Sequence, residues 1–148
     1  MSQTHLALHY HLVFHTKGNI ALIGDDWRDR LHAFLGGCLK TIGAVPIAIG
    51  GTADHVHILI GLLATHRLAD VVKEIKVASS KWAHNEMNKG LFAWQGGYGA
   101  FTVSTSQLER VRQYVLNQEE HHRERSAREE YIELLKLAGV DYDERFLD

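Results

Sequence analysis

Two histidines separated by one residue occur in the strongly apolar stretch Asp54-His55-Val56-His57-Ile58-Leu59-Ile60-Gly61-Leu62. The stretch follows the turn-forming Gly50-Gly51-Thr52, and most of its other side chains are β-branched or leucine. We therefore expect a strand that is buried on both faces. Side chains alternate along a strand at about 3.3 Å per residue, which puts His55 and His57 on one face about 6.6 Å apart. Two imidazoles at this spacing can bind one metal ion.

The histidine pair is a weak signal by itself. The chain has 11 histidines in 148 residues, so roughly one such pair is expected by chance, and His9-Tyr10-His11 is a second one. The alternative interpretation is that these histidines are structural residues of a sheet. A metal site therefore needs support from elsewhere in the chain.

The segment from Thr4 to Thr16 alternates between two kinds of side chain. Leucines and aromatic residues share one face, namely Leu6, Leu8, Tyr10, Leu12 and Phe14. The other face is rich in histidine and consists of His5, Ala7, His9, His11, Val13 and His15. This period of two predicts a first strand with a dry face and a histidine-rich face. The alternative for each histidine is a half-exposed sheet surface.

Tyr114 and Gln118 form a second candidate pair, near the end of the chain. Ser104 and Gln107 match a capping box, which predicts a helix over residues 106–123. Residues four apart on a helix lie on one face, one turn from each other, so Tyr114 and Gln118 should be neighbours. Taken separately, they are better explained as a buried helix tyrosine and a surface glutamine.

The composition bounds the kind of protein. A chain of 148 residues with 45% hydrophobic residues suggests one domain, residues 1–148, with a substantial core. It has no apolar run of membrane-spanning length and no charged leader, so we expect a soluble, cytoplasmic protein that does not associate with membranes. The single Cys38 excludes an intrachain disulfide and fits a reducing compartment. The net charge of −2 does not indicate a general nucleic-acid binder.

Further elements follow from hydrophobic periodicity. A helix capped by Asp25 or Asp26 is expected to run to about Ile42, and a second helix from about Leu68 to Met87. Strands are expected over residues 45–50, which form a hairpin with the histidine strand, and over residues 99–104. A last helix should begin at the capping box of Ser126 and Glu129 and end at Gly139.

The predicted order is strand, helix, strand, strand, helix, strand and two helices. This order is typical of an α+β fold: a ferredoxin-like split β-α-β antiparallel sheet with additional C-terminal helices. In that topology the first and third strands are neighbours. The histidine-rich face of the first strand would then continue the face of His55 and His57.

Basic side chains offer candidate phosphate contacts. Lys73 and Lys76 are neighbours one turn apart on the second helix, with Lys81 further round. Arg110 lies on the predicted helix of Tyr114. Because such residues are usually solvated surface, DNA contact by these four residues depends on other evidence for DNA binding.

Several blocks occur together in a specific order. They are Tyr10-His11-Leu12-Val13-Phe14-His15-Thr16-Lys17, Asp54-His55-Val56-His57, Ser79-Ser80-Lys81-Trp82, Phe92-Ala93-Trp94-Gln95-Gly96-Gly97-Tyr98-Gly99-Ala100-Phe101 and Tyr114-Val115-Leu116-Asn117-Gln118-Glu119-Glu120-His121-His122. In these blocks, over nearly its whole length, the chain resembles the single-tyrosine HUH transposases of insertion sequences. An isolated His-x-His is weak, but its combination with Tyr-x-x-x-Gln on a late helix is specific.

The resemblance implies DNA transposition by cleavage and rejoining of single-stranded DNA at the ends of an insertion sequence. It implies that His55, His57 and Gln118 bind a divalent ion, Mg²⁺ or Mn²⁺. Tyr114 would attack a DNA phosphate and leave a 5′-phosphotyrosine link with a free 3′-hydroxyl. The expected substrate is hairpin-containing single-stranded DNA. His121 and His122, just past Gln118, could approach the ion, but the resemblance assigns them no role.

The chemistry of these residues agrees with that implication. A phenol with a pKa of about 10 is a poor nucleophile at neutral pH, so it benefits from a metal that polarises the phosphate. A covalent intermediate conserves the energy of the phosphodiester, so rejoining needs no ATP. Imidazole ligands favour ions softer than Mg²⁺, so Mn²⁺ should be at least as good a cofactor.

The resemblance also implies a homodimer in which the two active sites can be shared. The strand over residues 99–104 should lie at an edge of the sheet, where pairing with a second chain is favoured. Two alternatives belong to other functional classes. One is a non-catalytic module of ferredoxin-like fold that binds single-stranded nucleic acid, and the other is a histidine-rich metalloprotein of the same topology.

Overall fold

The computed structural model of the chain describes residues 2–122 and 125–147. Within these residues the strands form one four-stranded antiparallel sheet in the order β2-β3-β1-β4. The strands are β1 (Leu8–His15), β2 (Val45–Gly51), β3 (His55–Leu62) and β4 (Gly99–Thr102). The sheet confirms the predicted ferredoxin-like arrangement, with the first and third strands as neighbours.

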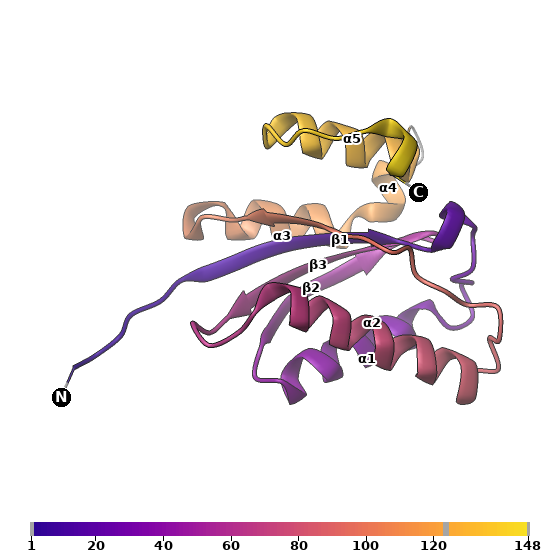
Figure 1. Cartoon of the computed structure of the whole chain (residues 1–148), viewed down its shortest axis with the longest axis horizontal. Coiled ribbons are helices and arrows are strands. Elements are labelled where there is room, and N and C mark those ends of the chain that lie inside the picture. Colours follow the sequence, from indigo (N-terminus) through magenta and orange to yellow (C-terminus); the bar gives the residue numbers. More distant parts are fainter. Residues whose placement is uncertain (1, 123–124, 148) are drawn as a thin grey trace.

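Helices cover both faces of the sheet (Figure 1). On one face lie α1 (Arg28–Thr41) and α2 (Leu68–Asn85); on the other lie α3 (Leu108–Leu116), α4 (Gln118–His121) and α5 (Ala127–Leu137). Single 3₁₀ turns occur at Lys17–Asn19, Thr105–Gln107 and Glu144–Phe146. Because the sheet is covered on both sides, β3 is buried along almost its whole length, as its composition predicts.

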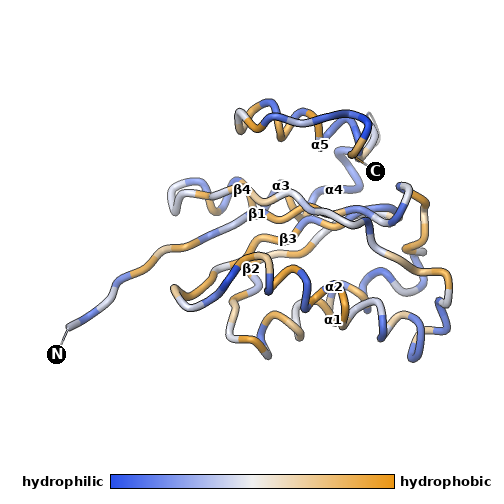
Figure 2. Tube along the Cα trace, in the orientation of Figure 1, coloured by the Kyte–Doolittle hydropathy of each residue, from blue (hydrophilic) through white to orange (hydrophobic). Residues whose placement is uncertain are grey.

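The main core lies between the sheet and the α1–α2 layer. Leu12 and Phe14 of β1 pack there with Leu35 of α1 and Ile75 of α2. In Figure 2 the traces of β2 and β3 are mainly hydrophobic, and those of α1 and α2 alternate between hydrophobic and hydrophilic residues. Each fully buried side chain of this size contributes about 1.5–3 kcal/mol. The alternation of β1 therefore has the predicted result, because its dry face is in the core and its histidine-rich face points to the opposite layer.

The opposite layer is held by smaller apolar clusters. Leu59 of β3 packs with Val115 of α3, and Val13 of β1 packs with Tyr131 and Leu135 of α5. A Cβ atom at Gly50 of β2 would lie 1.9 Å from the carbonyl oxygen of Val115. Glycine at this position therefore lets the backbone of α3 approach the sheet closely.

None of the helices in the described part of the chain combines the length and apolar character needed to span a bilayer.

Several predicted boundaries are wrong. β1 begins at Leu8 rather than Thr4, because Leu8 pairs with Leu62, the last residue of β3, and no partner strand continues beyond it. The preceding residues extend away from the sheet (Figure 1). β4 ends at Thr102 instead of Ser104, and α2 ends at Asn85 instead of Met87.

Two of the predicted helix caps are also wrong. No side chain caps α1, whose N-cap residue is Trp27, and Asp25 instead pairs with Arg28 at 2.8 Å. At the next predicted cap, the N–H of Gln107 donates to the carbonyl oxygen of Ser104 at 2.9 Å, and a 3₁₀ turn forms. The hydroxyl of Ser104 therefore caps nothing.

The predicted helix over residues 106–123 is divided. It breaks at Asn117, whose φ and ψ are −100° and 30°, into α3 and α4. Its predicted end at Arg123 lies outside the described residues. The last capping prediction is confirmed, because the Ser126 hydroxyl accepts the Glu129 N–H at 3.1 Å at the start of α5. Gly139, with φ of +69°, follows the end of that helix.

Candidate active site

Histidines from β1 and β3 lie side by side on the face of the sheet below α3 and α5. His15 is opposite His55 in the antiparallel register, and His57 is opposite Val13. His55 and His57 are completely buried. The rings of His15 and His55 are 5.7 Å apart between centroids, and His11 Nε2 is 2.7 Å from His57 Nδ1. The two strands thus build the continuous histidine face that the topology predicts.

Each histidine of β3 is oriented by a hydrogen bond at its Nδ1 atom. His55 Nδ1 lies 2.8 Å from Asp54 Oδ1 and 3.0 Å from Thr52 Oγ1. His57 Nδ1 pairs with His11, as described above. Partners at Nδ1 fix the orientation of an imidazole and leave Nε2 available for a metal. Both Nε2 atoms reach the space below α3 and α5.

Tyr114 and Gln118 reach the same space from α3 and α4. Gln118 Oε1 is 2.9 Å from His55 Nε2, and Gln118 Nε2 donates to the Tyr114 carbonyl oxygen at 3.1 Å. The Tyr114 ring lies 5.7 Å from the His57 ring between centroids. All four residues that the sequence predicted for the active site, His55, His57, Tyr114 and Gln118, are therefore brought together within one chain.

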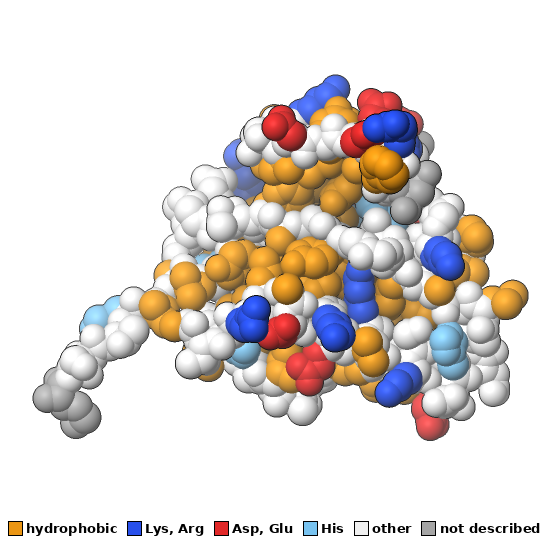
Figure 3. Space-filling view, viewed as in Figure 1, with side chains coloured by type: hydrophobic (Ala, Val, Ile, Leu, Met, Phe, Trp, Pro, Cys, Tyr) orange, Lys and Arg blue, Asp and Glu red, His pale blue; other side chains and the backbone are white. Residues whose placement is uncertain are grey.

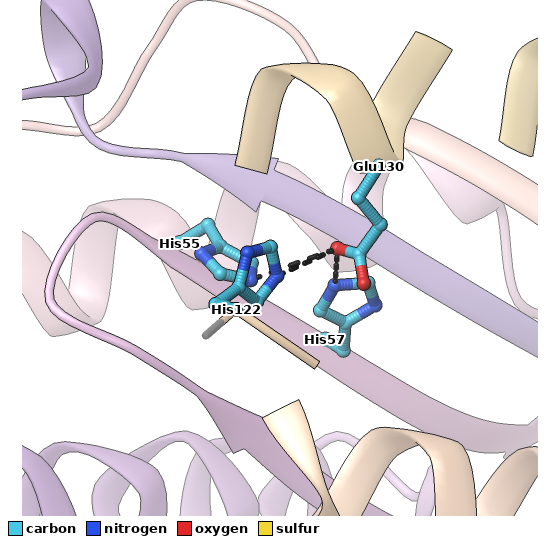
Figure 4. A group of neighbouring side chains, drawn as sticks. All are labelled: His55, His57, His122 and Glu130. Atoms are coloured by element: carbon cyan, nitrogen blue, oxygen red, sulfur yellow. Dashed lines mark hydrogen bonds and ion pairs between the residues drawn. The ribbon is translucent and has the colours of Figure 1, made fainter. Parts of the chain in front are cut away.

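Glu130 of α5 is a site residue that the sequence analysis missed. It is 1% exposed and descends from α5 toward three imidazoles (Figure 4). Its Oε1 atom is 2.7 Å from His57 Nε2, 3.2 Å from His122 Nε2 and 3.7 Å from His55 Nε2. Its Oε2 atom accepts the hydroxyl hydrogen of Tyr114.

Little in the sequence distinguishes Glu130 from Glu129, its neighbour in the first turn of the same helix. Only the docking of α5 over the sheet turns Glu130 inward while Glu129 stays exposed at the cap. His122, noted only for its proximity to Gln118, also joins the site: its Nε2 atom is 3.1 Å from Gln118 Oε1.

The donor atoms are arranged as a divalent metal requires. Among the described residues, His55, His57, His122 and Glu130 offer ligand atoms that all lie within 4.8 Å of one another. Donors bound at about 2.1 Å to one octahedral ion lie about 3 Å from their neighbours, close to the separations given above. Imidazole nitrogen combined with carboxylate and amide oxygen is a usual donor set for divalent metals. The residues present therefore fit such an ion.

Burial controls the charges at the site. It lowers the pKa of His57 to about 3 and that of His11 to about 4, so both rings are neutral at pH 7. Burial opposes ionisation of Glu130, but hydrogen bonds from His122 and His57 outweigh it and hold the carboxyl pKa below its usual value. The site therefore contains one buried carboxylate next to the neutral ring of His57, and this carboxylate raises the pKa of His122 despite the burial of that ring.

Tyr114 is a weaker acid here than in water. Burial raises the pKa of its phenol, and the hydrogen bond to the Glu130 carboxylate raises it further. A cation beside the hydroxyl would act in the opposite direction, because it stabilises the phenolate. The Tyr114 hydroxyl thus lies next to side-chain donor atoms that fit a divalent ion, and such an ion would lower the phenol pKa again.

Three of the predicted DNA contacts lie away from this site. Lys73, Lys76 and Lys81 belong to α2, on the other face of the sheet (Figure 1). The ammonium group of Lys76 donates to the Gln95 carbonyl oxygen at 3.0 Å, and burial lowers the pKa of this lysine to about 8. Lys76 is thus engaged in holding the loop before β4.

The other two lysines are exposed next to acidic residues. Lys73 and Lys81 line a shallow hollow with Asp70 and Glu74, and Figure 3 shows basic and acidic side chains interspersed on this face. Arg110 is exposed on α3, one turn before Tyr114. DNA contact by these residues stays a prediction, and Arg110 is the one on the helix that carries the tyrosine.

Solved structures with a similar fold include two transposases. A candidate transposase from Deinococcus radiodurans R1 is 26% identical, with a TM-score of 0.61 over 80% of this chain and 96% of that chain. A REP-associated tyrosine transposase bound to a REP hairpin is 12% identical, with a TM-score of 0.57 over 78% of this chain and 70% of that chain. The second likeness shows the fold alone.

Comparison with curated protein sequences gave no significant match. The family model described as "Transposase IS200 like" matches residues 4–118, which include the whole sheet, His55, His57, Tyr114 and Gln118. Because the matched segment makes up most of the chain and contains these residues, the protein belongs to the IS200-like transposase family.

Proposed function

We propose that this transposase cleaves and rejoins single-stranded DNA through a covalent link to Tyr114. The observation that carries the proposal is the convergence of the Tyr114 hydroxyl, two histidine Nε2 atoms and the Gln118 amide oxygen on one space. A nucleophile, imidazole nitrogen ligands and an oxygen ligand are components of metal-assisted phosphoryl transfer.

In the proposed cleavage step, the Tyr114 hydroxyl loses its proton, its oxygen attacks the scissile phosphorus, and the bond to the 3′ oxygen breaks. The products are a 5′-phosphotyrosine and a DNA 3′-hydroxyl, after the departing oxygen takes up a proton. Rejoining reverses these steps: a 3′-hydroxyl attacks the phosphotyrosine and releases Tyr114. Because each step exchanges one phosphoester bond for another, no ATP is needed.

His55, His57 and Gln118 are proposed to hold Mg²⁺ or Mn²⁺. When bound, the ion would polarise the phosphate and stabilise the developing negative charge. The protein groups orient it: Asp54 and His11 fix the two imidazoles, and Gln118 is tied to the backbone of Tyr114. Imidazole ligation favours Mn²⁺ over Mg²⁺ in affinity, while Mg²⁺ is the more abundant ion.

The proposed substrate is single-stranded DNA with a hairpin near the cleaved end. Support comes from the transposase of similar fold that is bound to a REP hairpin and from the net charge of −2, which disfavours broad binding of duplex DNA. Arg110 is proposed as a phosphate contact close to the site. Affinity for DNA should fall as the salt concentration rises.

The working unit is proposed to be a homodimer in which residues 1–148 act as one domain. Within the described residues, β4 is at the end of the sheet and has a partner on one side only, β1. An unpaired edge favours pairing with a second chain, and a two-fold axis there would extend the sheet across both subunits. α3 follows β4 closely, so it would leave from the dimer interface.

The test is to incubate the protein with a single-stranded DNA hairpin and Mn²⁺ and to separate the products on a denaturing gel. A covalent adduct that requires the metal supports the proposal. A non-catalytic DNA-binding module would retard the same hairpin on a native gel and give no adduct. A histidine-rich metalloprotein would bind Mn²⁺ and leave the DNA unbound.

A further inference from the structure

Glu130 contacts both halves of the candidate active site, with a different oxygen for each. Its Oε1 atom faces the Nε2 atoms of His57, His122 and His55, at the distances given above. Its Oε2 atom accepts the hydrogen bond of the Tyr114 hydroxyl. One rigid carboxylate group therefore spans the proposed metal ligands and the proposed nucleophile.

A cation beside Glu130 would compensate the charge of its carboxylate. The carboxylate is 1% exposed, and the ion pairs it makes within the described part of the chain are to histidines. Burying an ionised carboxylate is costly unless a charged partner compensates it. A divalent ion between Oε1 and the imidazoles would supply that charge and would keep a net positive site for a DNA phosphate.

The position of Glu130 is set by the packing of its helix. The Ser126 hydroxyl caps α5, and Tyr131 and Leu135 pack on Val13 of β1. A Cβ atom at Gly99 would come within 2.6 Å of the Tyr131 ring, so α5 lies close against the sheet. A carboxylate on a helix held in this way is preorganised rather than free to follow any nearby cation.

We propose that Glu130 is an additional metal ligand, through Oε1, that also positions the Tyr114 hydroxyl beside the ion, through Oε2. This inference rests on the proposed metal-dependent function and adds a residue from a helix that lies beyond the segment matched by the family. α5 then has a direct part in the site, because its Glu130 places the Tyr114 hydroxyl next to the ion.

The test compares Glu130→Gln with Glu129→Gln, an exposed neighbour on the same helical turn, in the full-length protein. Calorimetric titration with Mn²⁺ in the absence of DNA is the first readout. We expect Glu130→Gln to bind Mn²⁺ at least about 10-fold more weakly, because loss of even a hydrogen-bond partner of a ligand weakens metal binding by about 10- to 100-fold. Glu129→Gln should bind Mn²⁺ like the wild type. Unchanged or tighter binding by Glu130→Gln would overturn the inference, because the carboxylate would then be only a neighbour of the ion or an obstacle to it.

The second readout is adduct formation on a single-stranded hairpin at saturating Mn²⁺. In Glu130→Gln the Tyr114 hydroxyl is no longer positioned, so the rate constant of adduct formation should fall. The DNA concentration that gives the half-maximal rate should stay the same. An unchanged rate constant at full metal occupancy would refute the positioning role. Glu129→Gln should retain the wild-type rate.

Circular dichroism of each variant monitors folding. If Glu130→Gln does not fold, Glu130→Asp takes its place, because it keeps the charge and withdraws the oxygens by one methylene. We then expect measurable Mn²⁺ binding with a reduced adduct rate, and wild-type values for both would refute the inference. If the wild type binds Mn²⁺ but forms no adduct, the proposed function fails, and the calorimetric comparison still decides whether Glu130 is a ligand.

Discussion

The ring of Tyr114 lies edge-on to the ring of His57, with centroids 5.7 Å apart and planes at 77°. The two residues come from different layers: His57 from the buried strand β3, and Tyr114 from the helix that crosses above it. The close approach depends on Gly50, whose missing side chain leaves room for the backbone of α3. The proposed nucleophile and a proposed metal ligand are therefore neighbours in the folded chain before any DNA is present.

Replacing Tyr114 by phenylalanine should abolish the covalent adduct and leave DNA affinity nearly unchanged. The substitution removes the hydroxyl that Glu130 holds and keeps the ring packing against His57 and His121. Adduct formation is measured on a denaturing gel and affinity by fluorescence anisotropy. Residual adduct in Tyr114→Phe would assign the nucleophile to another residue.

Replacing His55 or His57 by alanine should eliminate Mn²⁺ binding and metal-dependent cleavage together. Gln118→Ala should have a milder effect, since an amide oxygen is the weakest of the three proposed ligands. Calorimetry measures the affinity, with His5→Ala, an exposed position near the N-terminus, as the control. Wild-type Mn²⁺ affinity in both histidine variants would exclude a metal at this site.

Gly50→Ala should destabilise the protein and reduce adduct formation. The new Cβ atom would lie 1.9 Å from the Val115 carbonyl oxygen, so α3 must shift away from the sheet, at a cost of about 1–3 kcal/mol. Thermal unfolding and the adduct assay measure the two effects.

The control for this substitution is Gly37→Ala in α1, where a Cβ atom meets nothing within 4 Å. Alanine inside a helix should stabilise the protein by about 0.5–1 kcal/mol there. Equal stability of the two variants would contradict the close approach of α3 to β2.

Acid should destabilise the protein in part through His32 of α1. Burial, with a contribution from Arg28, lowers the pKa of His32 to about 4 from its ordinary 6.5. Between these values the unfolded chain binds a proton that the native protein does not, so stability is complete above pH 6.5 and falls as the pH drops toward 4. The loss amounts to about 3 kcal/mol at pH 4.

His32→Leu removes this proton and should flatten the pH dependence. The free energy of unfolding, measured by urea titration from pH 4 to pH 7.5, should decline less steeply in the variant by about 1.4 kcal/mol per pH unit. Parallel curves for the two proteins would show that His32 titrates normally in the folded state.

A mixture of His57→Ala and Tyr114→Phe tests whether the active sites are shared. Each variant alone should be inactive, and light scattering should report a dimer at micromolar concentration. If α3 can dock over the partner subunit, mixed dimers restore part of the cleavage. A dimer without rescue would mean that each Tyr114 works with the histidines of its own chain, in agreement with the contact between Tyr114 and His57 within one chain. A monomer would refute the proposed dimer.

The sequence alone determined the periodic features of this protein. Alternation placed the histidines of β1 and β3 on one face, because side-chain direction in a strand depends only on residue parity. The four-residue spacing of Tyr114 and Gln118 likewise made them neighbours, although the helix breaks at Asn117 between them. The order of strands and helices was enough for the ferredoxin-like sheet. These are local or topological relations, and they need no knowledge of packing.

Tertiary structure decided what no local pattern contains. Ser104 fits a capping box as well as Ser126 does, yet only Ser126 caps a helix, because a 3₁₀ turn uses the Gln107 N–H first. Glu130 resembles Glu129 until α5 packs on Val13 and turns one carboxylate into the histidine cluster. Long-range packing, through the apolar contacts of Tyr131 and Leu135, therefore selected the residue that joins the nucleophile to the proposed metal ligands.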